Sequence, residues 1–189
     1  MRLERHERTA RAITLIRRGM RTSIVWQISG LAPVLVRELY EEVHGRRPTA
    51  GQLPTSSGIL CSPHRQASAS LFAALYRALG GETIARTVVV DALLKAHALY
   101  LEQLDRLPGE PLGPPMDINQ AWVIARDLTI GEARFRGCQR CGIRYLAGDF
   151  SRVALCCPVC VLKGRSRSAR GNQLCAGIAE SGQVGDRDA

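Results

Sequence analysis

The segment CQRCGIRYLAGDFSRVALCCPVC, residues 138–160, decides the fold of the C-terminal part of this 189-residue chain. Its cysteines form two Cys-x-x-Cys pairs separated by fifteen residues, Cys138 with Cys141 and Cys157 with Cys160. Two residues between thiols let one tight turn aim both sulfurs at a common point, and two such turns close a tetrahedral set of four ligands. Gly142, directly after the first pair, tolerates the positive φ that this turn requires.

Four thiolate ligands favour one Zn²⁺ ion over hard cations. Because the protein fills all four positions, no site is left for a water molecule, and the metal is expected to be structural rather than catalytic. A module this short cannot bury a core of its own, so metal binding should supply most of its folding free energy, on the order of 10 kcal/mol. An Fe–S cluster or two disulfides are the alternatives, and Cys156 is an alternative ligand to Cys157.

The positive charge of the chain is concentrated around these cysteines. The net charge is +9, and residues 131–170 carry nine Arg or Lys against two acids. A compact basic module is typical of a protein that binds the phosphate backbone of nucleic acid, whereas the alternative is a solvated surface. Between the two cysteine pairs, only Tyr145 and Phe150 offer aromatic rings for stacking on single-stranded bases, which favours duplex DNA. The candidate DNA contacts are Arg140, Arg144, Arg152, Lys163, Arg165, Arg167 and Arg170.

Apolar residues recur at helical spacing through the first 130 residues, which predicts a mostly α-helical body. The expected helices cover residues 10–20, 22–28, 33–44, 67–80, 83–104 and 118–128, and residues 46–63 are expected to form a loop. Pro33 suits the first turn of its helix, and Gly45 suits the end. Residues 22–44 have the outline of a helix-turn-helix, but Glu38, Glu41 and Glu42 on the second helix would repel phosphates. Docking of a partner protein is therefore at least as good an interpretation as DNA reading.

The pattern divides the chain into three parts. Residues 1–130 form the helical body, residues 131–163 a zinc-ribbon-like module with four cysteine ligands, and residues 164–189 a flexible tail that begins basic and ends acidic. Within the module, residues 143–149 and 151–155 are expected to pair as a short hairpin.

Several function classes are disfavoured by the sequence. No apolar run is long enough to span a membrane, and the arginine-rich N-terminus does not resemble a secretory signal. Paired cysteines without such a signal indicate metal ligands in a reducing compartment, so we expect a cytoplasmic protein. The sequence contains no Gly-x-Ser-x-Gly, phosphate-binding loop or His-Glu-x-x-His motif, and its four histidines are scattered singly. We therefore expect no enzymatic activity.

A series of short matches along residues 10–163 points to one family. They are Glu38-Leu39-Tyr40 ahead of Gly45, Gly51-x-Leu53-Pro54, Tyr100-Leu101-Glu102-Gln103, Ala121-Trp122 and the two Cys-x-x-Cys pairs. Each is weak alone, but in this order and at these separations they are specific. On these residues the chain resembles the FlhC family of flagellar transcriptional activators.

The resemblance implies a mostly α-helical zinc protein in which Cys138, Cys141, Cys157 and Cys160 take the family's ligand positions. It further implies that the helical body docks FlhD in a heterohexamer, and that this complex binds promoter DNA and activates flagellar operons through RNA polymerase. Two other function classes stay open at this point. One is a scaffold whose zinc module binds protein, and the other is an RNA-binding or RNA-processing factor.

Overall fold

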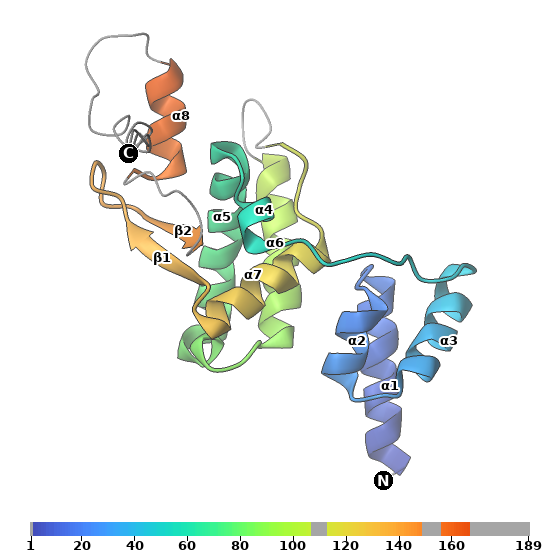
Figure 1. Cartoon of the computed structure of the whole chain (residues 1–189). Helices are drawn as coiled ribbons and strands as arrows, with labels where there is room; N and C mark the ends of the chain where they lie inside the picture. Colours follow the sequence, from blue (N-terminus) through green and yellow to red (C-terminus); the bar gives the residue numbers. More distant parts are fainter. Residues whose placement is uncertain (1, 107–112, 149–155, 167–189) are drawn as a thin grey trace, which may run out of the picture.

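The structure is a computed structural model that describes residues 2–106, 113–148 and 156–166. It is mostly α-helical, with one small antiparallel sheet (Figure 1). In chain order the described elements are α1 (Arg2–Arg17), α2 (Thr22–Ser29), α3 (Pro33–His44), α4 (Ser56–Ile59), α5 (Pro63–Gly80), the 3-10 helix η1 (Gly81–Ala85), α6 (Val90–Arg106), α7 (Ile118–Ile130), β1 (Ala133–Gly137), β2 (Arg144–Gly148) and α8 (Pro158–Ser166). Within the described residues, no helix has the length and apolar character needed to cross a bilayer.

Helices α1, α2 and α3 form an N-terminal unit in which all three helices contact one another. Pro33 begins α3 within its first two helical positions, and Gly45 ends it with φ 64°, as the sequence predicts. Gly30 ends α2 in the same left-handed conformation, with φ 66°. The helix-turn-helix outline of residues 22–44 is thus present as two short helices joined by a tight turn.

Helices α4 to α7 form a second unit, which Figure 1 shows joined to the first by an extended connection. Its centre is the α5–α6 pair, where Phe72, Tyr76 and Tyr100 are fully buried. The Tyr100 hydroxyl lies 2.5 Å from Ser68 Oγ and accepts a hydrogen bond from the backbone N–H of Met116. The buried hydroxyl of Tyr100 therefore has hydrogen-bond partners.

The two helical units share one continuous hydrophobic core and a polar junction at the start of α7. Asn119 accepts a hydrogen bond from the backbone N–H of Arg21 at 2.8 Å and donates one to the carbonyl of Gly19 at 3.1 Å. His97, also buried, lies on α6 with Nε2 2.9 Å from the carbonyl oxygen of Met116. Its role is that of a satisfied core residue.

The helix boundaries correct the sequence prediction in several places. Helix α1 begins at Arg2 rather than at residue 10, α4 lies inside the expected loop, and α5 begins at Pro63 rather than at residue 67. The predicted helix 83–104 begins only at Val90, because Gly81–Ala85 form a 3-10 turn and the Val89 N–H bonds to the Tyr76 hydroxyl at 3.0 Å. The bond to Tyr76 and the β-branched residues Thr87 and Val88 favour a non-helical backbone just before α6.

The structure describes a strand pairing that the sequence did not predict, and it leaves the predicted hairpin untested. Strand β2 pairs antiparallel with β1, from Ala133 opposite Gly148 to Gly137 opposite Arg144, and the first cysteine pair forms the connection. The proposed partner strand, residues 151–155, lies outside the described residues. Helix α8 runs to Ser166, so the first three residues of the expected flexible tail are helical, and residues 167–189 also lie outside the described part.

Candidate metal centre

The first cysteine pair is held in the turn between β1 and β2. The backbone N–H of Cys138 donates to the carbonyl of Ile143 at 3.0 Å, and the N–H of Gly142 donates to the carbonyl of Cys138 at 2.8 Å. Gly142 has φ 73°, the left-handed conformation expected from the sequence. These contacts fold the chain back on itself so that the Cys138 and Cys141 sulfurs point to one place.

The second pair lies at the beginning of α8. Cys157 directly precedes this helix, and Cys160 lies in its first turn. The N–H of Cys157 donates to the Cys138 sulfur at 3.1 Å, and the N–H of Cys160 donates to the Cys157 sulfur at 3.4 Å. Such N–H···S bonds and the positive end of the helix dipole both stabilise thiolates.

The four sulfurs fit a single tetrahedral metal ion. All four Sγ atoms of Cys138, Cys141, Cys157 and Cys160 lie within 4.8 Å of one another. The Cys138–Cys160 separation is 4.0 Å and the Cys141–Cys157 separation is 3.6 Å. Zn–S bonds of about 2.3 Å place the sulfurs of a tetrahedral site about 3.8 Å apart. The four sulfurs could therefore hold one metal ion after small adjustments, and the cluster contains Cys157 rather than Cys156, which is buried beside it.

The thiols of the cluster differ in acidity. Burial raises the pKa of the Cys138 thiol, but backbone N–H groups of Cys157, Cys141 and Arg140 outweigh it and lower that pKa to about 6. The hydrogen bond with the Cys141 side chain, followed by burial, raises the pKa of Cys160 to about 12, and burial raises the pKa of Cys157. One sulfur is thus prepared as a thiolate, and a bound metal would displace the remaining protons.

The metal module is fastened to the helical body through the outer edge of β2. The side-chain amide of Gln66 on α5 donates to the carbonyl of Leu146 at 3.0 Å, and the N–H of Leu146 donates to Ser70 Oγ at 3.0 Å. These two side chains, one turn apart on α5, take the place of a neighbouring strand at Leu146. The Arg77 guanidinium lies over the ring of Phe135, 5.5 Å from its centre, and holds β1 to the same helix. Sequence reasoning missed this docking, because polar residues on a helix carry no sign of a strand partner.

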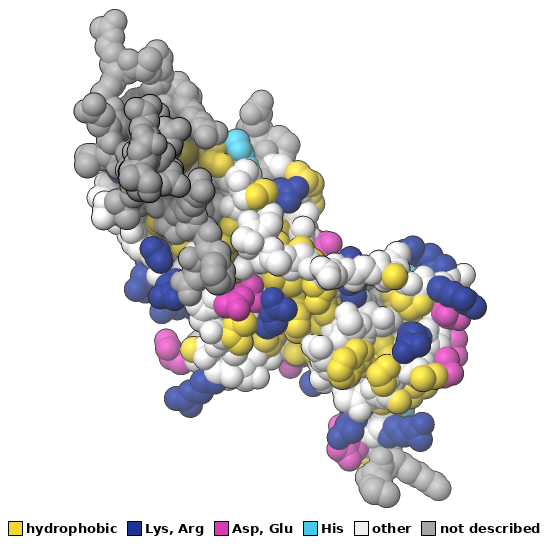
Figure 2. Space-filling model, in the orientation of Figure 1, with side chains coloured by type: hydrophobic (Ala, Val, Ile, Leu, Met, Phe, Trp, Pro, Cys, Tyr) yellow, Lys and Arg dark blue, Asp and Glu magenta, His cyan; other side chains and the backbone are white. Residues whose placement is uncertain are grey.

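The candidate DNA contacts are only partly within the described residues. Arg140, Arg144 and Lys163 are exposed around the metal module, where Figure 2 shows Lys and Arg side chains beside the β1–β2 end. The Arg140 guanidinium lies beside Gly164 of α8, 3.9 Å from where a Cβ would be, so the first knuckle and α8 present charge together. The backbone of Arg165 lies in α8, and Arg152, Arg167 and Arg170 lie outside the described residues.

The helix-turn-helix face is acidic, as the sequence predicts. Glu38, Glu41 and Glu42 on α3 are all exposed, so this helix does not offer a surface for phosphates.

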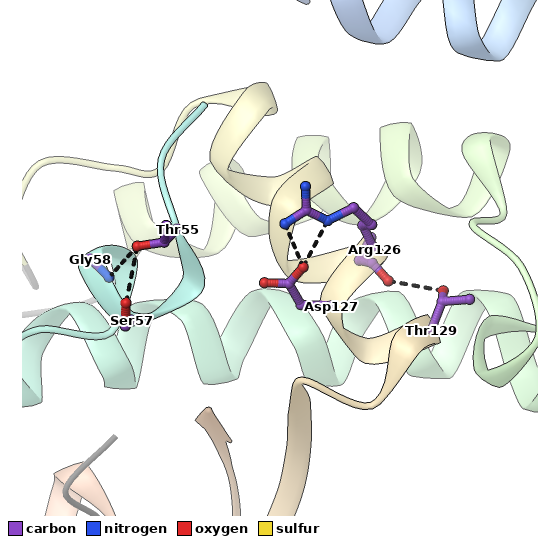
Figure 3. Close-up of polar contacts among 7 residues, drawn as sticks. Thr55, Ser57, Gly58, Arg126, Asp127 and Thr129 are labelled. Carbon is purple, nitrogen blue, oxygen red and sulfur yellow. Dashed lines mark hydrogen bonds and ion pairs between the residues drawn. The ribbon is translucent and has the colours of Figure 1, made fainter. Parts of the chain in front are cut away.

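A polar cluster on α7 was not anticipated from the sequence. Figure 3 shows the Arg126 guanidinium facing Asp127. Its Nε donates a hydrogen bond to Asp127 Oδ1 at 2.8 Å, and its Nη2 forms an ion pair with the same oxygen at 2.7 Å. The Arg126 guanidinium also lies over Trp122, 5.4 Å from the ring centre. Asp127 Oδ2 is the one buried side-chain nitrogen or oxygen without a hydrogen-bond partner in the described part of the chain. The arrangement fixes Arg126 and offers neither a nucleophile nor an acid–base pair.

Comparison with known proteins identifies one family. Residues 2–173 match the family model described as "Flagellar transcriptional activator (FlhC)". Proteins named flagellar transcriptional regulator FlhC are similar to this chain in several bacteria. The relative from Thauera aminoaromatica is 27% identical over 169 residues, covering 89% of this chain and 84% of the relative. That from Yersinia enterocolitica is 28% identical over 162 residues, covering 84% and 81%. That from Paraburkholderia phymatum is 33% identical over 136 residues, covering 72% of this chain and 60% of the relative.

Proposed function

The chain belongs to the FlhC family of flagellar transcriptional activators, and from this we propose that it is the zinc-containing, DNA-binding subunit of an activator complex formed with FlhD. Membership makes it a transcriptional regulator of flagellar genes rather than an enzyme. A regulator of this kind acts at DNA, so the structural question is which of its surfaces meets the duplex.

The observation that carries the proposal is the four-sulfur cluster with basic side chains around it. The sulfur separations and the all-thiolate ligand set favour one structural Zn²⁺ ion. Such an ion would hold the first knuckle against α8 and fix Arg140, Arg144 and Lys163 in one orientation. Of the two aromatic residues of this module that the structure describes, Tyr145 is buried with 2% of its surface exposed, and Phe135 is half-buried with the Arg77 guanidinium over its ring. Neither ring offers an open face for stacking on bases, and this supports duplex DNA over single strands.

A protein partner is supported by the surface of the N-terminal unit. Trp26 on α2 and Val34 on α3 are large apolar residues with 40% and 59% of their surface exposed. Aromatic residues on a polar background are typical anchors of protein interfaces. We propose that FlhD covers this part of the helical body in a heterohexamer, and that the assembled complex contacts RNA polymerase in the cytoplasm.

A binding titration with duplex DNA tests the proposal. The chain, with and without co-expressed FlhD, is titrated onto a flagellar promoter fragment, and zinc is measured in the same preparations. We expect one zinc per chain, and binding that needs FlhD and weakens when zinc is removed. The variant Arg140→Ala/Arg144→Ala/Lys163→Ala should keep its zinc and lose DNA affinity at moderate salt.

The opposite results would select another function. If the zinc-loaded complex fails to bind promoter DNA, the metal site would still be supported, but a scaffold whose zinc module binds protein would become the better interpretation. Preference for RNA of the same sequence would favour an RNA-binding factor.

A further inference from the structure

The positive charge of the chain has a second concentration, in helix α1. Residues 1–21 carry seven arginines against two glutamates, whereas residues 22–130 carry nine basic residues against ten acidic ones. Figure 2 shows Lys and Arg side chains around the lower end of the N-terminal unit, where α1 projects in Figure 1. The chain is therefore basic at both ends of the described structure and close to neutral between them.

The first half of α1 contributes nothing to the core. From Leu3 to Arg11 no side chain is buried, and the first buried residue of the helix is Ala12. Leu3 itself has 80% of its surface exposed. The beginning of α1 projects beyond α2 and α3 (Figure 1), and the Arg8 guanidinium reaches the turn between those two helices, 3.8 Å from where a Cβ of Gly30 would lie. Because this stretch contributes no side chain to the core, its charges are available to a partner.

The charges at the start of α1 are only partly matched to the helix dipole. Arg5 lies in the first turn of α1 together with Glu4, where the positive end of the dipole favours the acid and disfavours the arginine. In the described residues one arginine of the segment is ion-paired, Arg8 with Glu4, and that pair is exposed. Positive charge that is unfavourable for the free helix becomes favourable when an anionic partner neutralises it.

The spacing of the arginines suits an extended anion. Arg5, Arg8 and Arg11 follow one another at intervals of three residues, so they form a ridge that winds slowly around α1. The ridge covers about 9 Å along the helix axis. Each strand of duplex DNA carries one negative charge for about every 3.4 Å of the duplex axis, so about three phosphates of a single backbone fall within the length of the ridge.

We propose that the projecting half of α1, through Arg5, Arg8 and Arg11, is a second surface that contacts the phosphate backbone of duplex DNA. The inference rests on the proposed function and extends it, because it adds a contact at the end of the molecule opposite the metal module. The duplex is then held at both ends of the chain, and the acidic face of α3 takes no part. Contacts between the α1 arginines and the DNA phosphates would position the duplex without distinguishing its bases.

The test uses the complex of the chain with FlhD and a labelled promoter duplex, whose affinity is measured over a range of salt concentrations. The variant Arg5→Ala/Arg8→Ala/Arg11→Ala removes the ridge, and alanine keeps the helix, as circular dichroism can verify. We expect the slope of log affinity against log salt to fall by about 2.7, or about 0.9 for each lost phosphate contact. Hydroxyl-radical protection should be lost at one end of the footprint only.

The matched control is Arg86→Ala/Lys95→Ala/Arg106→Ala, which removes the same charge from exposed positions of the second unit. It includes an exposed i,i+4 pair, Arg106 with Glu102, like the Arg8–Glu4 pair of the ridge. The control should leave both the salt slope and the footprint unchanged. An equal fall of the slope in both variants would overturn the proposal, because it would mean that the net charge of the chain, and not the position of Arg5, Arg8 and Arg11, determines the affinity.

Two further outcomes separate this inference from the proposed function. If the metal-module variant lowers the salt slope and the α1 variant does not, the second surface is wrong and the proposed function stands. If neither lowers it, both fail. Loss of FlhD from the complex in the α1 variant would also overturn the inference, since α1 would then be a protein-docking element.

Discussion

The hydrogen bonds between α5 and β2 predict that the metal module can be loosened from the body without loss of its metal. In Gln66→Ala/Ser70→Ala, the backbone carbonyl and N–H of Leu146 lose their partners, while all four cysteines are untouched. Leu146 has no exposed surface, so water does not simply replace those partners. The zinc content should remain at that of the parent chain.

The size of the effect follows from two lost hydrogen bonds. Each contributes about 1 kcal/mol net, so local opening of β2 should become easier by about 2 kcal/mol, or about 30-fold in population. Hydrogen exchange followed by mass spectrometry on peptides covering residues 144–148 measures this opening directly. Peptides from α1 to α3 should exchange as in the parent, because the perturbed contacts lie only between α5 and the module.

A control variant, Ser23→Ala/Gln27→Ala, makes the same chemical change on the exposed face of α2, away from the contacts between α5 and β2. It should leave exchange in β2 unaltered. Unchanged exchange of residues 144–148 in the α5 variant, with zinc retained, would refute the reasoning. It would mean that the metal and the apolar contacts alone hold the module in place.

Three other changes have defined outcomes. Cys141→Ser removes one of four sulfurs and should abolish tight zinc binding and unfold the metal module, so one equivalent of zinc in the purified variant would contradict the assignment. Tyr76→Phe leaves the half-buried Val89 N–H without its acceptor and should lower the free energy of unfolding by about 1 kcal/mol in urea titrations; an unchanged midpoint would show that the bond does not set the start of α6. Burial holds the pKa of His97 below its ordinary value of 6.5, so the unfolded chain takes up a proton more readily. The stability that comes from keeping His97 neutral is therefore complete above about pH 6.5 and declines as the pH falls below that value. In His97→Gln the side-chain amide can still donate to the Met116 carbonyl, so this variant should lose less stability between neutral and acidic pH than the parent. Parallel curves of unfolding free energy against pH for the two proteins would contradict this role of His97.

The clustering of the four cysteine sulfurs could be predicted from the sequence because its determinants are local. Two residues between thiols, a glycine after the first pair and a proline in the second fix each knuckle within a few residues. Only the meeting of the two knuckles is a long-range event, and the chemistry of four thiols leaves one sensible outcome for it. The helix ends marked by Pro33, Gly30 and Gly45 were predictable for the same reason.

The remaining features depend on contacts between distant segments. The sequence carried no sign that residues 133–137 would form strand β1 and pair with β2 across the first knuckle. Helical periodicity ran through Thr83–Val89, where the Tyr76 hydroxyl accepts a hydrogen bond from the Val89 backbone N–H. In both places the local pattern was compatible with more than one structure, and a contact outside that pattern selected the observed one.

These contacts define how the metal module is held. A two-stranded hairpin alone is marginal in water. The four sulfurs bring its turn to α8, and Gln66 and Ser70 cover the outer edge of β2 at Leu146. Helix α8 also packs against α5 and β1 against α7, so the module contacts the body at several places. With the edge fastened to α5, folding by the metal also fixes the direction in which Arg140, Arg144 and Lys163 face, and loss of either anchor should weaken DNA binding even when the basic residues are all present.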